Sequence, residues 1–182
     1  MKYAEYYKLP DKAEFLNKVV TVASMLGLQA DDLMTMFFLE STVNPSAQNK
    51  YTRATGLIQF IPSTAADLGT TVEELKQMTG TEQLDYVYKY LKIWRNKVRD
   101  YHDLYIAIFY PAALGKGDDY VIGTADNRVA KIAQQNAAYD LNKDGKITVA
   151  ELKTAIDLRI LKKKRKTQHL TEQPSSSPEQ PL

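Results

Sequence analysis

Apolar side chains recur at helical spacing along most of the chain. In residues 12–26 they repeat every three or four positions, and the set is Phe15, Val19, Val22 and Leu26. This spacing predicts an amphipathic helix that Gly27 ends. Similar patterns predict helices over 31–41, 62–67, from 71, 81–99, 104–114, around 126–138 and from about 149 onward. Because the helical pattern covers nearly the whole chain, the predicted fold class is all-α.

The longest apolar run covers residues 104–114 and has 11 residues. It is apolar on nearly every face, which predicts a buried helix that Pro111 breaks. A helix that crosses a membrane needs about 20 apolar residues, so no membrane span is expected.

The residue types narrow the possible chemistry. The chain has 182 residues, 44% of them apolar, which suits one ordinary domain with a small appendage. It contains no cysteine, which excludes disulfides, thiolate metal sites and a cysteine nucleophile. The two histidines, His102 and His169, are too few and too far apart for a zinc protease motif. Catalysis is expected to rest on carboxylates or hydroxyls.

The formal net charge of +2 conceals an uneven distribution. Residues 159–166 hold six basic side chains, and outside them 18 Lys and Arg stand against 22 Asp and Glu. This mildly acidic remainder does not favour nucleic acid as a partner. The basic run fits a solvated helix end, where cations suit the negative end of the helix dipole. The alternative for the run is attraction to anionic polymers.

One carboxylate lies where an apolar side chain is expected. The apolar face of the helix over 31–41 consists of Leu33, Met36, Phe37 and Glu40. Apolar neighbours and the negative end of the helix dipole both disfavour a charged Glu40, so its pKa is expected to be raised. A carboxylic acid that stays protonated near neutral pH is what cleavage of a glycosidic bond requires. The alternative is a glutamate at a helix end that reaches solvent.

The residues from Glu40 onward form an ordered series of motifs, which runs through a polar segment, 42–56, that predicts an irregular loop. The series is Glu40-Ser41, Asn44-Pro45-Ser46-Ala47, Ala54-Thr55-Gly56-Leu57-Ile58-Gln59 and Pro62-Ser63-Thr64-Ala65. It resembles the lysozyme-like catalytic domain of lytic transglycosylases, which cleave peptidoglycan. The resemblance is dense over residues 39–66 and implies a lysozyme-like helical domain.

The resemblance also implies roles for matching residues. Glu40 would be the single general acid/base, and Ser41 and Gln59 would line the cleft and hydrogen-bond the sugar or its N-acetyl group. A later Tyr-Asn-Ala-Gly motif of the family corresponds to residues 110–115, where Tyr110 would hold Glu40 in place at the substrate site. Pro111 replaces the family's Asn, so that amide contact is missing or made elsewhere. The alternative for Tyr110 is an ordinary core tyrosine.

The number of acids bears on the reaction. Hydrolytic glycosidases generally use two carboxylates about 5–10 Å apart, and no second acid accompanies Glu40 in the motif. The family's reaction on the β-1,4 bond between N-acetylmuramic acid and N-acetylglucosamine needs only one. There the substrate's N-acetyl group stabilises the reacting centre, and its C6 hydroxyl completes a 1,6-anhydro product. Hydrolysis stays open if Asp67 or Asp85 folds close enough to position a water molecule.

A second group of oxygen ligands follows. Residues 140–151 read Asp-Leu-Asn-Lys-Asp-Gly-Lys-Ile-Thr-Val-Ala-Glu, the pattern of an EF-hand calcium loop. The predicted ligands are Asp140, Asn142, Asp144, the backbone carbonyl of Lys146, Thr148 directly or through water, and Glu151. Because no second loop is found, we expect a structural Ca²⁺ ion rather than a sensor. The alternative is an Asx-rich turn without metal.

Three parts of the chain are therefore expected. They are a lysozyme-like catalytic domain over 1–122, an EF-hand helix-loop-helix over 123–166 and a disordered tail over 167–182. The expected partner is the glycan strand of bacterial peptidoglycan, and the chain is expected to be a monomer unless it belongs to a virion. The N-terminus has no apolar signal segment, and the Tyr-Pro-Ala-Ala variant suggests a phage-encoded protein, so a phage lysin or virion protein acting at the cell wall is expected. A non-catalytic wall-binding module is the alternative, and the retained Glu40 disfavours it.

Overall fold

The computed structural model describes residues 1–172, with side chains described through Gln168. It confirms the all-α prediction, since this part of the chain forms no strand and only isolated β-bridges. The α-helices are α1 Lys12–Leu26, α2 Ala30–Ser41, α3 Pro62–Asp67, α4 Val72–Gln77, α5 Gly80–Leu91, α6 Tyr101–Phe109, α7 Val129–Gln135 and α8 Val149–Glu172. Four 3₁₀ turns join them, Ala4–Tyr6, Lys92–Trp94, Pro111–Ala113 and Thr124–Asp126. No single helix in residues 1–172 is long and apolar enough to cross a membrane; α1 and α2 meet that requirement only as a pair, bent by 110°.

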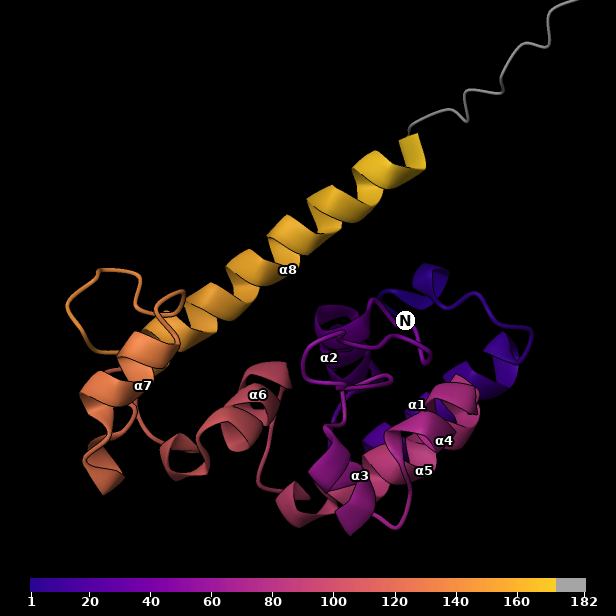
Figure 1. Ribbon diagram of the computed structural model, residues 1–182, viewed down its shortest axis with the longest axis horizontal. Coiled ribbons are helices and arrows are strands. Elements are labelled where there is room, and N and C mark those ends of the chain that lie inside the picture. Colours follow the sequence, from indigo (N-terminus) through magenta and orange to yellow (C-terminus); the bar gives the residue numbers. More distant parts are fainter. Residues whose placement is uncertain (173–182) are drawn as a thin grey trace, which may run out of the picture.

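The core of the helical body forms where α1 packs against α2 and α5 (Figure 1). α1 buries the four residues predicted from its spacing, Phe15, Val19, Val22 and Leu26. α5 contributes Leu84, Val87 and Leu91 from its own apolar face. Each such side chain stabilises the fold by about 1.5–3 kcal/mol when it leaves water. This packing holds α2, and with it Glu40, in a fixed position.

α5 is shorter than the helix predicted over 81–99. It ends at Leu91 and is followed by the turn Lys92–Trp94. Asn96 then adopts a left-handed conformation, with φ of 60°, and donates its backbone N–H to the carbonyl oxygen of Leu26 at 3.2 Å. A contact between segments distant in the sequence therefore ends the helical pattern.

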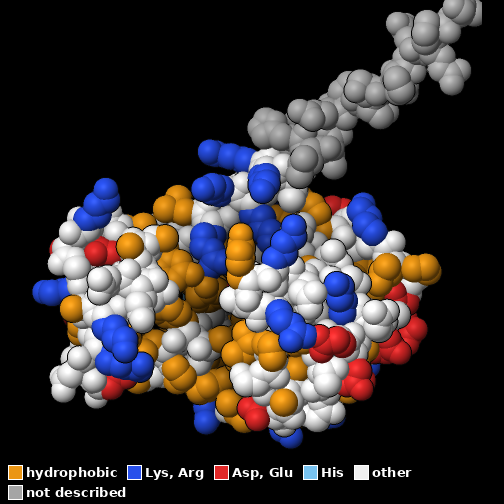
Figure 2. All heavy atoms as spheres, viewed as in Figure 1, with side chains coloured by type: hydrophobic (Ala, Val, Ile, Leu, Met, Phe, Trp, Pro, Cys, Tyr) orange, Lys and Arg blue, Asp and Glu red, His pale blue; other side chains and the backbone are white. Residues whose placement is uncertain are grey.

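α8 is the longest helix and passes α2 and α6 on its way across the molecule (Figure 1). Lys and Arg side chains gather on the part of the surface that it forms (Figure 2). The helix continues to Glu172, beyond the expected start of the tail at residue 167, while residues 173–182 lie outside the described part. The start of α8 is joined to the segment before α7, because Ile122 N donates to Ile147 O at 2.8 Å and Val149 N donates to Tyr120 O at 3.0 Å. Residues 120–122 thus pair with the helix-loop-helix that was expected to begin at 123.

Candidate active site

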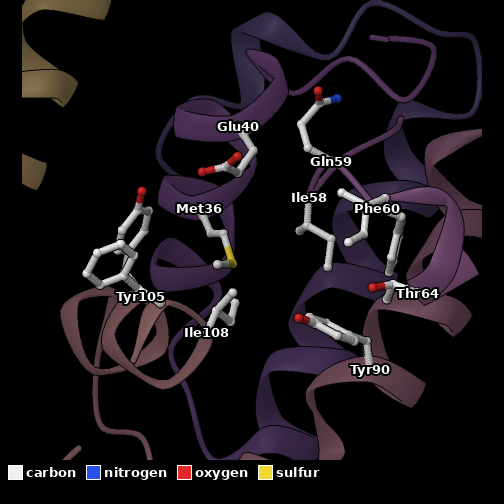
Figure 3. A pocket seen from close by; sticks show the side chains of 11 residues that line it. Met36, Glu40, Ile58, Gln59, Phe60, Thr64, Tyr90, Tyr105 and Ile108 are labelled. Carbon is white, nitrogen blue, oxygen red and sulfur yellow. The ribbon is translucent and has the colours of Figure 1, made fainter. Parts of the chain in front are cut away.

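A cavity of about 420 Å³ opens in the helical body, and Glu40 lies on its wall. The lining residues are Met36, Glu40, Ile58, Gln59, Phe60, Ile61, Thr64, Tyr90, Tyr105, Ile108 and Phe109. Figure 3 shows two facing walls, with Glu40, Met36, Tyr105 and Ile108 on one side and Gln59, Ile58, Phe60, Thr64 and Tyr90 on the other. In Figure 2, hydrophobic side chains border the corresponding hollow on the surface. Glu40 is the one carboxylate among these lining residues.

Glu40 occupies the last turn of α2 after an unbroken run of buried residues, 33–39. Its side chain is half-buried, and no described residue donates a hydrogen bond to its carboxylate. Burial raises the pKa of Glu40 above its ordinary value, and the positive charges of Arg159 and Lys163 act in the opposite direction. The direction of this pKa shift agrees with the expectation from the sequence.

Ser41 is buried and does not line the cavity. Its hydroxyl lies 3.0 Å from the carbonyl oxygens of both Phe37 and Leu57, and it accepts a hydrogen bond from the backbone N–H of Asn44 at 3.2 Å. The hydroxyl therefore joins the end of α2 to the two loops that carry the motifs. Ser41 therefore has a bracing position outside the lining of the Glu40 cavity, and its contact with substrate stays a prediction.

Gln59 does line the cavity, on the wall opposite Glu40 (Figure 3). Its backbone is left-handed, with φ of 55°, and its Nε2 donates to the carbonyl oxygens of Ala47 and Gly56, each at 3.1 Å. These two bonds fix the amide group. A contact with substrate would therefore use the Oε1 atom as an acceptor.

A buried glutamine in α5 holds the loops that surround the cavity. Gln83 is fully buried, its Oε1 accepts from the backbone N–H of Leu57 at 2.9 Å, and its Nε2 donates to Pro45 O and Leu75 O, each at 2.7 Å. Gly56 has a φ of 86°, and a Cβ there would lie 2.5 Å from Gln83 Oε1. Gln83 belongs to none of the sequence motifs and was not predicted. Its place on the buried side of an amphipathic helix is the signal that could have identified it.

Tyr110 lies apart from Glu40. The residue before a proline avoids helical geometry, and Tyr110, before Pro111, accordingly has an extended φ of −151° just after α6 ends. Its ring is buried outside the cavity, and its hydroxyl donates to Asp126 Oδ1 at 3.1 Å. The hydrogen bond expected between Tyr110 and Glu40 is therefore replaced by one to Asp126.

Tyr105, on the preceding turns of α6, is the tyrosine beside Glu40 (Figure 3). Its hydroxyl lies 2.6 Å from the hydroxyl of Tyr139 and accepts a hydrogen bond from Arg159 Nη1 at 2.5 Å. Burial raises the pKa of Tyr105, so this hydroxyl stays protonated. The sequence pattern gave no signal for Tyr105 beyond its place in an apolar run.

The acids considered as partners for Glu40 lie elsewhere. Neither Asp67 nor Asp85 lines the cavity. The carboxylate of Asp85 is paired with Lys18 Nζ at 2.9 Å, on the α1 side of the body. The described part of the cavity therefore offers no second carboxylate for activating water.

The loop over 140–151 is folded by hydrogen bonds to its own acidic side chains. Asp140 Oδ2 accepts from the backbone N–H of Gly145 at 2.9 Å, and Gly145 has a left-handed φ of 81°. The Glu151 carboxylate accepts from the N–H groups of Thr148 at 2.9 Å and Asn142 at 3.3 Å. These hydrogen bonds turn the loop around the side chains of Asp140 and Glu151.

The remaining predicted ligands lie on the exposed part of the same loop. The backbone N–H of Lys146 donates to Asp144 Oδ1 at 2.9 Å, and the apolar anchor Ile147 is buried. Within residues 1–168, no three acidic or histidine side chains are gathered closely enough to hold a metal ion. The loop thus has the backbone turns and the oxygen atoms of the motif. Side-chain oxygens of Asp140, Asn142, Asp144 and Glu151 accept hydrogen bonds from backbone amides of the loop.

Residues 21–103 match the Transglycosylase SLT domain family. The matched segment contains Glu40, the motif loops, Gln59 and Gln83. The match supports the prediction of a lysozyme-like domain with lytic transglycosylase activity on peptidoglycan. No curated protein matches the chain. Tyr105 and all of α7, the loop over 140–151 and α8 lie beyond the matched segment.

Proposed function

We propose that this protein cleaves the β-1,4 bond between N-acetylmuramic acid and N-acetylglucosamine in peptidoglycan, with Glu40 as its single general acid/base. The observation that carries the proposal is geometric. The half-buried carboxylate of Glu40 is the one acid among the described residues that line a cavity, and most of these lining residues lie in the matched segment. We propose that the chain acts as a monomer unless it belongs to a virion. A peptidoglycan substrate implies action at the bacterial cell wall, in keeping with a phage lysin or virion role.

The proposed reaction uses Glu40 twice. Protonated Glu40 gives its proton to the glycosidic oxygen as the bond from that oxygen to C1 of N-acetylmuramic acid breaks. The substrate's N-acetyl carbonyl stabilises the positive charge that develops at C1. The C6 hydroxyl of the same sugar then attacks C1, and Glu40 takes up its proton. The products are a 1,6-anhydro end and a free 4-hydroxyl, and no water is consumed.

The three other residues of the predicted site have different places in this proposal. Gln59 is proposed to accept a hydrogen bond from the sugar or its N-acetyl group through Oε1, since its Nε2 is already engaged. Ser41 and Tyr110 would act from behind the cavity wall, through the bonds that they make to neighbouring loops. Hydrolysis of the same bond is the alternative outcome of the product analysis described below.

We also propose that the loop over 140–151 binds one structural Ca²⁺ ion. The donors suit it, because calcium prefers carboxylate, amide and carbonyl oxygens, and the left-handed Gly145 permits the tight turn. Asp140, Asn142, Asp144, Lys146, Thr148 and Glu151 would hold the ion. When bound, calcium would replace loop amides as the partner of these oxygens and tie the loop to the start of α8.

The first experiment is loss of turbidity of purified bacterial cell walls. Glu40→Gln removes the proton donor with little change in size, so activity is expected to fall by about 100- to 10,000-fold. Glu14→Gln is the matched control, because Glu14 is an exposed glutamate of α1. Full activity in the Glu40→Gln protein would refute the proposed function.

A further inference from the structure

A lysine of α8 caps the end of the helix that carries Glu40. Lys163 Nζ donates to the carbonyl oxygen of Leu39, the residue before Glu40, at 2.7 Å, and lies 5.7 Å from the ring centroid of Phe38. Carbonyls in the last turn of a helix have no partner within the helix and form its negative end. The ammonium group therefore satisfies one of these carbonyls and offsets the negative end beside Glu40.

One helical turn earlier, Arg159 braces the wall beside Glu40. Residues four apart share a face of a helix, so Arg159 and Lys163 approach the body together. Arg159 Nη1 donates to the hydroxyls of Tyr105 and Tyr139 at 2.5 and 2.8 Å, and the guanidinium carbon lies 5.5 Å from the Tyr105 ring centroid. Tyr105 lines the cavity, so Arg159 fixes a part of its surface.

The position of both cations is set by the docking of α8 as a whole. Asp157 accepts a hydrogen bond from the Tyr101 hydroxyl at 2.7 Å and lies 2.9 Å from His102 Nε2, both on α6. Toward the other end, the Thr167 hydroxyl lies 3.0 Å from that of Tyr6. Contacts along the length of α8 therefore hold it against α6 and the N-terminal segment.

The two cations have no other acid to neutralise them. Neither Arg159 nor Lys163 forms an ion pair within residues 1–168. Both interact with the charge of Glu40, which is also faced by the hydroxyl-bearing ring of Tyr105. The opposite wall of the cavity, with Gln59, carries no charged side chain.

We infer that α8 contributes two positioning residues, Arg159 and Lys163, to the reaction site. Their positive charges set the electrostatic environment of Glu40, although both residues lie outside the family-matched segment. The inference rests on the proposed function of Glu40. A general acid/base works best when its pKa lies near the working pH, and burial raises the pKa of Glu40. The cations oppose that effect and allow Glu40 both to release and to regain its proton.

The test is the pH dependence of cell-wall cleavage by Lys163→Met and Arg159→Met, with Lys162→Met as the control. Lys162 is an exposed lysine of the same helix. Rates are compared below pH 8, because burial lowers the pKa of Lys163 to about 8 and its charge is lost above that. Removing a cation should raise the pKa of Glu40, so the alkaline fall in activity should move to higher pH by about one unit. The control should keep the wild-type position.

Conservative variants separate charge from packing. Lys163→Arg should restore the wild-type pH profile, whereas Lys163→Gln, which keeps a donor without the charge, should show the shifted one. A purely structural role would lower the melting temperature and the rate without moving the profile, and that result would overturn the inference. If the wild type itself does not cleave cell walls, the proposed function fails. If it cleaves and no variant moves the profile, only the inference fails.

Discussion

Glu40 and Glu151 are two glutamates that the fold treats in opposite ways. Glu40 lies in the last turn of α2, receives no hydrogen bond from a described residue, and has its pKa raised by burial. Glu151 lies in the first turn of α8 and accepts hydrogen bonds from Thr148 and Asn142. Burial acts to raise the pKa of Glu151 too, but these hydrogen bonds outweigh it and lower the pKa.

The difference shows how one residue type can serve two kinds of chemistry. A carboxylate among apolar side chains, at the negative end of a helix and without donors, keeps a proton that it can give to a leaving group. A carboxylate at the positive end of a helix with N–H donors stays ionised and suits a cation. The cavity and the loop over 140–151 both contain a glutamate, and they differ in whether N–H groups donate hydrogen bonds to its carboxylate.

The largest effect on stability is expected from substituting a glycine in each of the two regions. Gly56 and Gly145 both have left-handed backbones, but a Cβ at Gly56 would meet Gln83 Oε1 at 2.5 Å, whereas nothing lies within 4 Å at Gly145. Gly56→Ala should therefore lower the free energy of unfolding by about 2 kcal/mol, and Gly145→Ala by about 1 kcal/mol. Chemical denaturation of both variants measures the difference. Equal losses would contradict the proposed role of the Gln83 contact.

Calcium should act on the loop and leave the cavity's acid unchanged. At a Ca²⁺ concentration about ten times the dissociation constant, binding to the folded state alone would add about 1.4 kcal/mol of stability. For a chain of this size that corresponds to a rise in melting temperature of about 3–6 °C. Asp144→Asn should reduce the rise, and Mg²⁺ at the same concentration serves as the cation control. If neither Ca²⁺ nor a chelator changes the melting temperature of the wild-type protein, the proposed calcium site is refuted.

A smaller effect concerns the stability cost of the buried acid. Because the folded-state pKa of Glu40 is raised, its contribution to stability is complete below the unfolded-state pKa and is lost as pH rises through the folded-state value. The amide side chain that Glu40→Gln introduces does not titrate, so the stability of this variant relative to wild type should rise from low to high pH. Thermal melts of both proteins across that range test the sign. A relative loss with rising pH would show that Glu40 is held as an anion.

Most helices could be predicted from the sequence because they depend on local pattern. The spacing of Phe15, Val19 and Val22 is sufficient for α1, and Gly27 marks its end. The end of α5 could not be predicted in this way. It depends on Asn96 reaching the carbonyl of Leu26, a contact that appears only when the two segments are packed together.

The candidate site shows the same division. Glu40 and Gln59 could be identified because their motifs are contiguous, and the cavity brings them to facing walls. Tyr105 and Arg159 could not, because they come from α6 and α8 and meet only through the docking of those helices. Tyr110 was assigned by its position in a single motif, and this assignment did not predict its hydrogen bond. Pro111 changes the backbone conformation of Tyr110, whose hydroxyl donates to Asp126.

We propose that one acid cleaves the glycan and that no water is consumed. Mass spectrometry of the muropeptides released from purified cell walls tests this reaction most directly. The digestion is carried out with the wild-type protein in water enriched in oxygen-18. The single-acid mechanism predicts 1,6-anhydro ends that are lighter by one water than hydrolysed ends and carry no heavy oxygen. Reducing N-acetylmuramic acid ends that carry oxygen-18 would contradict it and show a hydrolase.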